Sequence, residues 1–149
     1  MTCCGPDAAW RGPWPGRGRR PRLSLQAFAS GAPGNVAAAC LDGQVLAAVC
    51  VEVVQSQGAA GPATVVRVAD HPGMRRAADT VASRLNLTGL IGLDFILDSG
   101  TGAAQLIELN PRATPTAHLL GADGADLAAA LAAGLARRPP RAKTRPRYA

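Results

Sequence analysis

The chain has 149 residues, of which 48% are hydrophobic, 17% are charged and only 3% are aromatic. This length corresponds to about one domain, whose core must be built from Ala, Val, Leu and Ile. No stretch reaches the roughly 18 consecutive apolar residues that a membrane-spanning helix needs, which excludes an integral membrane protein of that kind.

The net charge of +6 comes from the two ends of the chain. Residues 1–22 carry five arginines and one aspartate, and residues 137–149 carry six basic residues and no acidic one. Residues 23–136 carry five arginines and nine acidic residues, so the part that we expect to fold is acidic. A nucleic-acid reader needs a basic surface within its fold, and none is predicted here. We expect 1–22 to be a disordered leader rich in Arg, Pro and Gly, 23–136 to be the folded domain, and 137–149 to be a flexible basic tail.

The four cysteines, Cys3, Cys4, Cys40 and Cys50, show no C-x-x-C spacing. The sequence therefore predicts neither a zinc site nor a disulfide framework. Cys40 and Cys50 lie in apolar, strand-like runs, where buried free thiols are ordinary. This cysteine usage favours a reducing, cytoplasmic setting.

Apolar runs separated by turn signals predict a sheet of short strands. Asp42-Gly43 lies between two such runs and is a strong signal for a two-residue hairpin turn. A second turn is expected over 98–102, between two later runs. The predicted strands cover residues 23–29, 35–41, 44–54, 64–68, 90–97 and 104–110.

Two helices are also predicted, one between the fourth and fifth of these strands and one after the sixth. The first runs over 71–86 and begins with Asp70-His71-Pro72, a polar cap followed by proline in the first turn. The second is an Ala/Leu helix over 123–135, capped by Asp123. The fold class expected from this pattern is α+β: an antiparallel sheet with both helices packed on one face.

The hairpin over 90–112 carries the candidate site. Side chains alternate along a strand, so Glu108 and Asn110 share one face of the second strand. A five-residue turn over 99–103 would place Asp94 directly opposite Glu108. Directly opposed residues hold their Cβ atoms about 5 Å apart, so the two carboxylates would face each other.

Two carboxylates this close destabilise a protein unless a proton or a cation separates them. Together with the amide oxygen of Asn110, waters and a phosphate, they form an oxygen ligand set for Mg²⁺. Arg112 continues the same face four residues after Glu108, and an arginine beside a magnesium site most simply holds phosphate oxygens. The residues thus indicate a site for a nucleotide phosphate and magnesium.

The alternative is that Asp94 and Glu108 lie on the solvent-exposed face of the hairpin. Apolar Leu106 and Ile96 are expected on that same face, and a fully solvated face accommodates them poorly. The metal-site interpretation is therefore the better fit.

The hairpin resembles the end of an ATP-grasp domain, in particular that of carbamoyl-phosphate synthetases and biotin carboxylases. Two segments carry the resemblance: Gly92-Leu93-Asp94-Phe95-Ile96-Leu97 and Leu106-Ile107-Glu108-Leu109-Asn110-Pro111-Arg112. An acid followed, after a turn, by Glu-x-Asn-x-Arg is a fairly specific combination. Two upstream segments resemble the hinge strand of that family and the hairpin after it: Gln26-Ala27-Phe28-Ala29-Ser30-Gly31 and Asp42-Gly43-Gln44-Val45-Leu46. The resemblance covers residues 23–135 and implies that they form the C-terminal subdomain of an ATP-grasp domain.

The resemblance implies roles for individual residues. Asp94, Glu108 and Asn110 would bind the Mg²⁺ or Mn²⁺ ions that bridge the phosphates of ATP, and Arg112 would be catalytic, at the centre of phosphoryl transfer. The adenine would be bound by main-chain groups of Gln26, Ala27 and Phe28 at its edge, and by Ile96 and Ile107 as the floor of its pocket. Members of the family activate a carboxylate as an acyl phosphate, which an amine or another nucleophile attacks, so catalysis consists mostly of positioning and charge neutralisation.

The ATP site of that family lies between two lobes, and the other lobe supplies lysines that bind the phosphates. Nothing before Leu23 resembles that lobe, and Lys143, the only lysine, lies in the basic tail. Three functions stay open: an ATP- and Mg²⁺-binding half-site completed by another polypeptide, a truncated and inactive remnant, or an interaction module that binds nucleic acid through its basic ends. The acidic folded part disfavours the last. The sequence identifies neither the carboxylate substrate nor the nucleophile.

Overall fold

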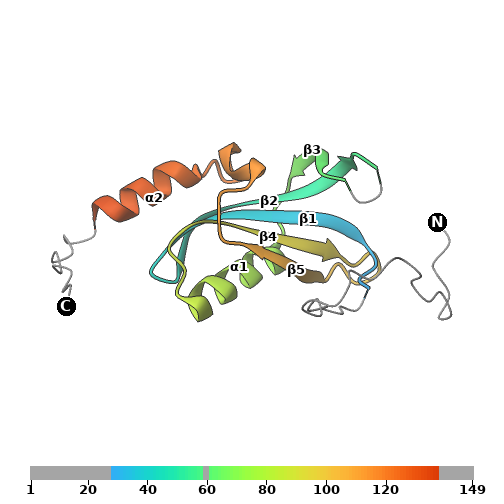
Figure 1. Cartoon of the computed structure of the whole chain (residues 1–149), viewed down its shortest axis with the longest axis horizontal. Helices are drawn as coiled ribbons and strands as arrows, with labels where there is room; N and C mark the ends of the chain where they lie inside the picture. Colours follow the sequence, from blue (N-terminus) through green and yellow to red (C-terminus); the bar gives the residue numbers. More distant parts are fainter. Residues whose placement is uncertain (1–27, 59–60, 138–149) are drawn as a thin grey trace, which may run out of the picture.

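In the computed structural model, residues 28–58 and 61–137 are described, and they form a five-stranded antiparallel sheet with two α-helices (Figure 1). The strands lie side by side in the order β3-β2-β1-β4-β5. This arrangement confirms the predicted α+β class and antiparallel sheet. The elements in chain order are β1 Ala32–Leu41, β2 Gln44–Ser56, β3 Ala63–Val68, α1 Pro72–Leu85, β4 Gly89–Leu97, β5 Ala104–Asn110, the short 3-10 helix η1 Pro115–His118, and α2 Leu127–Ala136.

A two-residue turn joins β1 to β2, as the Asp42-Gly43 signal predicts. Both residues have left-handed backbone angles, with φ of 49° at Asp42 and 80° at Gly43, which is the pattern of a type I′ hairpin turn. The Asp42 N–H donates to Thr88 Oγ1 at 2.8 Å, and the Gly43 N–H donates to the Leu87 carbonyl at 3.0 Å. The turn is therefore tied to the segment that leads from α1 into β4.

Helix α1 covers one face of the sheet. It is capped by His71, whose Nδ1 accepts a hydrogen bond from the Met74 N–H at 3.2 Å. Met74, Ala78 and Ala82 are fully buried and recur every four residues, which places them on one side of the helix. They pack into a cluster with residues of β1, β2 and β4: Val36, Ala38, Cys40, Ala48, Cys50, Ile91, Leu93, Phe95 and Leu97.

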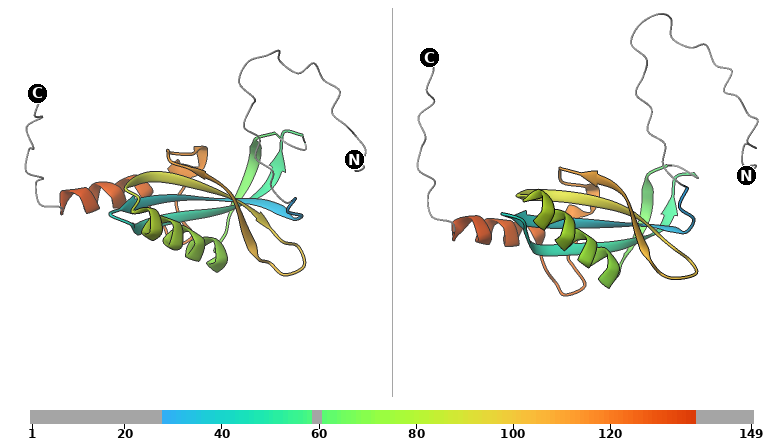
Figure 2. Two further views of the ribbon diagram at one scale, coloured as in Figure 1. Left: turned by 60° about the horizontal axis from the view of Figure 1, so that its bottom comes forward. Right: turned by 90° about the horizontal axis from the view of Figure 1, so that it is seen from below.

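The opposite face of the sheet is covered by α2 and η1, so the prediction that both helices share one face is wrong (Figure 1, Figure 2). Leu127 of α2 packs with Ala37 and Ala39 of β1, and Ala117 of η1 joins the same cluster. Because side chains alternate along β1, Ala37 and Ala39 point away from the α1 side. The central strands are apolar on both faces, and a sheet of that kind needs a cover on each side.

Helix α2 begins later than predicted, at Leu127, and its cap is Asp126 rather than Asp123. The Asp126 carboxylate accepts a hydrogen bond from the Ala129 N–H at 2.9 Å. Gly124 has a φ of 79°, a left-handed conformation that a right-handed helix does not contain. Asp123 therefore belongs to the preceding turn, where its carboxylate accepts from the Ala125 N–H at 3.0 Å.

Cys40 and Cys50 are free, buried thiols in the cluster under α1, as predicted. Burial raises the pKa of both thiols. Asp79 raises the pKa of the Cys40 thiol further, whereas Arg75 opposes the effect of burial at Cys50. Neither thiol is therefore poised to act as a thiolate.

Some predictions fall on residues outside the described ranges. These are the leader 1–22, Cys3 and Cys4, the tail from residue 138 onward, and most of the strand expected over 23–29. Phe28 and Ala29, the last residues of that expected strand, are described and are not part of a strand. In residues 28–58 and 61–137, no helix is both long and apolar enough to cross a bilayer.

Candidate functional site

The pairing of β4 with β5 brings the two predicted carboxylates together. Asp94 lies directly opposite Glu108, and Gly92 lies opposite Asn110. This is the register that the sequence predicted for Asp94 and Glu108. Since Asn110 follows Glu108 by two residues, the three polar side chains lie along one face of two neighbouring strands.

The register is reached by a different route from the one predicted. Leu97 pairs with Ala104, so the loop has six residues rather than five, and a β-bulge at Ile107 restores the pairing of Asp94 with Glu108. Beyond the bulge Leu106 pairs with Phe95, whose side chain is buried on the α1 side. Leu106 therefore faces away from Glu108, and the prediction that they share a face is wrong.

The six-residue loop is closed by Asp98. Its N–H donates to the Ala103 carbonyl at 2.9 Å, and its carboxylate accepts from the Gly100 N–H at 3.1 Å. The N–H and hydroxyl of Thr101 also donate to this carboxylate, both at 2.7 Å. These hydrogen bonds, those from Thr101 foremost, lower the pKa of Asp98, because they favour its charged form. The loop thus fixes the strand ends that carry the acid pair.

The Asp94 carboxylate is held by two amides. Asn35 Nδ2 of β1 donates to Asp94 Oδ1 at 2.7 Å, and Asn110 Nδ2 of β5 donates to Asp94 Oδ2 at 2.9 Å. Asp94 is half-buried between the strands that carry its two donors. Asn35 was not among the predicted site residues. The signal that could have found it is a polar residue inside the apolar run of β1, directly opposite Asp94 in the β1–β4 pairing.

The acid pair has no basic partner in the part of the chain that the structure describes. The ion pairs there are Arg67–Glu52, Arg75–Asp70 and Arg75–Asp123. Asp94 therefore receives hydrogen bonds from neutral donors, and no ion pair among the described residues involves Asp94 or Glu108. Two carboxylates beside an amide are hard oxygen donors of the kind that bind Mg²⁺, so these residues fit such an ion. Within the described ranges no three His, Cys, Asp or Glu side chains could hold a metal together, so an ion here would also need Asn110 and oxygen atoms from water or a phosphate.

Arg112 lies directly after this strand pair and is exposed. Its N–H donates to the Asn110 carbonyl at 2.8 Å, which turns the chain at the end of β5. Its Nη1 donates to the Ala113 carbonyl at 3.2 Å. No ion pair among the described residues involves Arg112, so its guanidinium is available to an anion.

The residues expected to bind adenine are only partly brought together. Gln26 and Ala27 lie outside the described residues. Phe28 is 94% exposed, and Ile107, the unpaired residue of the bulge, is 38% exposed. Ile96 is half-buried, and the chain approaches it where it enters β1, since a side chain at Gly31 would touch Ile96 Cγ2.

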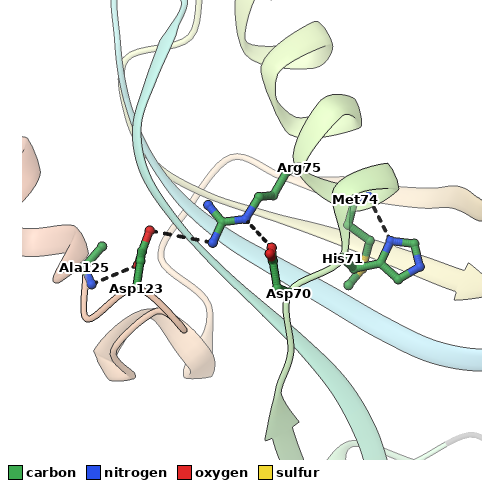
Figure 3. Close-up of polar contacts among 6 residues, drawn as sticks. All are labelled: Asp70, His71, Met74, Arg75, Asp123 and Ala125. Atoms are coloured by element: carbon green, nitrogen blue, oxygen red, sulfur yellow. Dashed lines mark hydrogen bonds and ion pairs between the residues drawn. The ribbon is translucent and has the colours of Figure 1, made fainter.

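One surface cavity lies away from the acid pair and contains none of the predicted site residues. It measures about 520 Å³ and is lined by residues at the start of α1 and in the loop before α2, including Asp70, Arg75 and Asp123. Arg75 Nε donates to Asp70 at 3.0 Å, and Arg75 Nη2 lies 3.8 Å from Asp123 (Figure 3). The two aspartates are largely exposed and Arg75 is half-buried, and ion pairs at the surface contribute about 0–1 kcal/mol each. We interpret this cluster as a link between α1 and the loop before α2.

Replacing Gly92 by alanine is expected to lower the free energy of unfolding by about 1–3 kcal/mol, the usual cost of overpacking. A Cβ at Gly92 would collide with Thr114 Cγ2, in the segment that leads from Arg112 to η1. Urea denaturation measures the change. The matched control is Gly100→Ala, because a Cβ there meets no atom closer than Asp98 Oδ1 at 3.5 Å. Equal stability of the two variants would show that Thr114 does not pack tightly on Gly92.

Comparison with known proteins identifies the family to which this fold belongs. The chain matches the family model of the ATP-grasp domain over residues 19–116. No curated protein matches it. One similar solved structure is the ATP-grasp ligase PsnB complexed with a phosphomimetic variant of its minimal precursor, Mg and ADP (18% identity, TM-score 0.48), where the match covers 74% of this chain and 34% of that one.

A second similar structure is the N5-carboxyaminoimidazole synthase of Aspergillus clavatus in complex with ADP and 5-aminoimidazole ribonucleotide (19% identity, TM-score 0.42). The match covers 68% of this chain and 30% of that one. This chain thus spans about a third of the length of either protein. The match to the family model runs over more than half of the 149 residues and includes β4, β5 and the acid pair. The chain therefore belongs to the ATP-grasp family.

Proposed function

We propose that this chain provides the ATP- and Mg²⁺-binding side of an ATP-grasp site of the carboxylate-ligase type. The observation that carries the proposal is the pair Asp94 and Glu108, which lie opposite each other on two neighbouring strands with Asn110 two residues further on, and which form no ion pair with any basic side chain of the described residues. Two opposed carboxylates repel each other and do not stabilise a protein, whereas a divalent ion is attracted by both of them. Membership of the ATP-grasp family supports the nucleotide as the source of the phosphate.

In this proposal Asp94, Glu108 and Asn110 would hold Mg²⁺ or Mn²⁺. When bound, such an ion would offset the negative charge of the ATP phosphates during phosphoryl transfer. The exposed guanidinium of Arg112 would donate to phosphate oxygens, and its planar fork suits two of them at once. The remaining contribution of the chain is positioning, since hydrogen bonds from Asn35 and Asn110 hold the Asp94 carboxylate. A carboxylate oxygen of the substrate would attack the γ-phosphorus of ATP and release ADP, which forms an acyl phosphate. An amine would then attack the acyl carbon and release inorganic phosphate.

Adenine binding belongs to the same proposal. Ile96 shares the face of Asp94 and lies beside the chain that enters β1, and Ile107 occupies the neighbouring strand. Main-chain groups of Gln26, Ala27 and Phe28 would contact the edge of the base, as the resemblance of this segment to the hinge strand of the family implies.

The described residues supply few positive charges for a triphosphate. They contain no lysine, and Arg67 and Arg75 are engaged with acids elsewhere on the sheet and on α1. We therefore propose that a separate polypeptide supplies further cations from the other lobe of the site. On this basis we expect the isolated chain to show little or no turnover of ATP and a carboxylate.

The proposal is tested by isothermal titration of Mg·ATP into the full chain. Wild type is expected to bind, and an Asp94→Asn, Glu108→Gln double variant is expected to lose the binding heat, because both carboxylates become neutral amides of the same shape. The matched control is Asp70→Asn, Asp79→Asn, which removes two negative charges at the α1 cavity and should leave binding unchanged. Equal binding by wild type and the site variant would contradict the proposal.

Two other functions are separated by the same titration. A wild-type chain that binds no Mg·ATP, alone or with a partner lobe, would favour the inactive remnant. An interaction module that acts through its basic ends would lose nucleic-acid binding when the six basic residues of 137–149 and the five arginines of 1–22 become glutamine. Nucleotide binding at the acid pair should survive that change.

A further inference from the structure

A polar chain of contacts runs from η1 across the sheet to the acid pair. Thr116 Oγ1 of η1 donates to Asn35 Oδ1 of β1 at 2.7 Å, between residues 81 positions apart in the sequence. Thr114 Oγ1 lies 3.2 Å from Thr116 Oγ1. All three side chains are partly buried, so water competes weakly for these contacts.

Two acceptors determine which end of the Asn35 carboxamide faces Asp94, and the Thr116 hydroxyl then holds the other end. The oxygen end accepts from Thr116, so the nitrogen end points toward Asp94 Oδ1 at 2.7 Å and toward the Leu93 carbonyl at 3.2 Å. The reverse orientation would set the amide oxygen against a carboxylate and a carbonyl, both of which only accept hydrogen bonds. The carboxylate and the carbonyl thus favour this orientation, and the Thr116 hydroxyl is compatible with it because it donates to the amide oxygen.

The oriented amide in turn fixes the Asp94 carboxylate. Asn35 donates to one of its oxygens and Asn110 to the other, so rotation of the carboxylate would break at least one hydrogen bond. Each carboxylate oxygen has about two lone pairs and keeps one for a further partner. The carboxylate is therefore held in place and retains lone pairs for a cation.

We propose that Asn35, held by the Thr116 hydroxyl, is a positioning residue that orients Asp94 for a divalent cation shared with Glu108. This inference rests on the proposed function. It also links the acid pair to the segment that carries Arg112, because Thr114 and Thr116 follow Arg112 within four residues. Groups that orient a metal ligand typically change metal affinity by about 10- to 100-fold when they are removed.

The test is the binding of Mn²⁺ alone to the full chain, followed by electron paramagnetic resonance of the free ion. Thr116→Val keeps the shape of the side chain but removes the donor to Asn35, and we expect it to weaken Mn²⁺ binding about tenfold. Asn35→Ala should weaken binding at least as much. Thr116→Ser retains the hydroxyl and is expected to bind within about twofold of wild type, which a purely structural role of the threonine methyl group would not predict.

Asp94→Asn separates failure of this inference from failure of the proposed function. If Asp94→Asn loses Mn²⁺ and Thr116→Val binds it as wild type does, the positioning role is overturned and the proposed function stands. If wild type takes up no Mn²⁺, or Asp94→Asn binds it unchanged, the proposed function fails and this inference fails with it.

A second measurement covers the case in which Thr116→Val does not fold. The side-chain amide resonances of Asn35 in the wild-type chain are followed by NMR during titration with Mg²⁺. We expect them to shift along one saturable curve together with those of Asn110, because both amides donate to the carboxylate that takes the ion. Resonances of Asn35 that stay fixed while those of Asn110 move would overturn the positioning role.

Discussion

Replacing Phe95 by alanine is expected to lower the free energy of unfolding by about 3–5 kcal/mol. Phe95 is 1% exposed and is the largest fully buried side chain among the described residues. It belongs to the same buried cluster under α1 as Met74 and Leu93. The loss combines the apolar surface returned to water with the cavity that remains. Many of the neighbours are alanines, which have no side-chain freedom with which to fill that cavity.

The chain offers a matched control for this experiment in its only other phenylalanine. Phe28 is 94% exposed, so Phe28→Ala should change stability by no more than about 0.5 kcal/mol in either direction. Urea denaturation of both variants, followed by circular dichroism, gives the two values. A similar loss in both would mean that Phe28 is buried in solution, and a small loss in both would mean that the cluster under α1 is loosely packed.

Replacing Glu108 by glutamine is expected to have two effects of opposite sign. Without divalent ions the variant should be more stable by about 0.2–1 kcal/mol, because like charges directly opposite on neighbouring strands destabilise a sheet. Its affinity for Mn²⁺ should fall at least tenfold, since an amide oxygen replaces a charged ligand. Denaturation in the presence of a chelator measures the first effect, and Mn²⁺ titration measures the second.

Glu52→Gln is the control for Glu108→Gln. Glu52 also lies on a strand, but it faces Arg67 on β3, at 2.5 Å in an exposed ion pair. Neutralising it should lower stability by about 0–1 kcal/mol, and it should leave Mn²⁺ affinity unchanged. Loss of stability in Glu108→Gln would contradict the idea that the acid pair is strained when no cation is bound.

The sequence predicted much of the sheet, because its signals are local. Asp42-Gly43 allows hardly any turn other than the tight hairpin that forms, and the bounds of β5 follow directly from its neighbouring turn residues. The bulge at Ile107 was not predictable in the same way. Leu106 and Ile107 are both apolar, so alternation does not show which of them is the extra residue. An error of one residue in the loop and the missed bulge cancelled, which is why the pairing of Asp94 with Glu108 was still correct.

The layer arrangement and Asn35 were missed for a common reason. Both depend on contacts between residues far apart in the sequence. Ala37 and Ala39 are as apolar as their neighbours, and only the packing of Leu127 shows that the second face of the sheet is covered. The partnership of Asn35 with Asp94 spans 59 positions and depends on the pairing of β1 with β4. Periodicity predicts which face a residue occupies, but it does not predict the partner across that face.

The central position of β1 has a consequence for the order in which the protein folds. β1 and β2 form a local hairpin, whereas pairing of β1 with β4 must close a loop of roughly fifty residues, at a substantial cost in chain entropy. Asn35 meets Asp94 only through that closure, and its contact with Thr116 closes a still longer loop, at a separation of 81 positions. A large share of such long-range contacts slows folding, because the entropy of loop closure is lost before the contacts compensate for it. The candidate site therefore exists only in the completed topology, so a ligand that binds there selects the native chain over every partly folded state and stabilises it in proportion to the logarithm of its concentration.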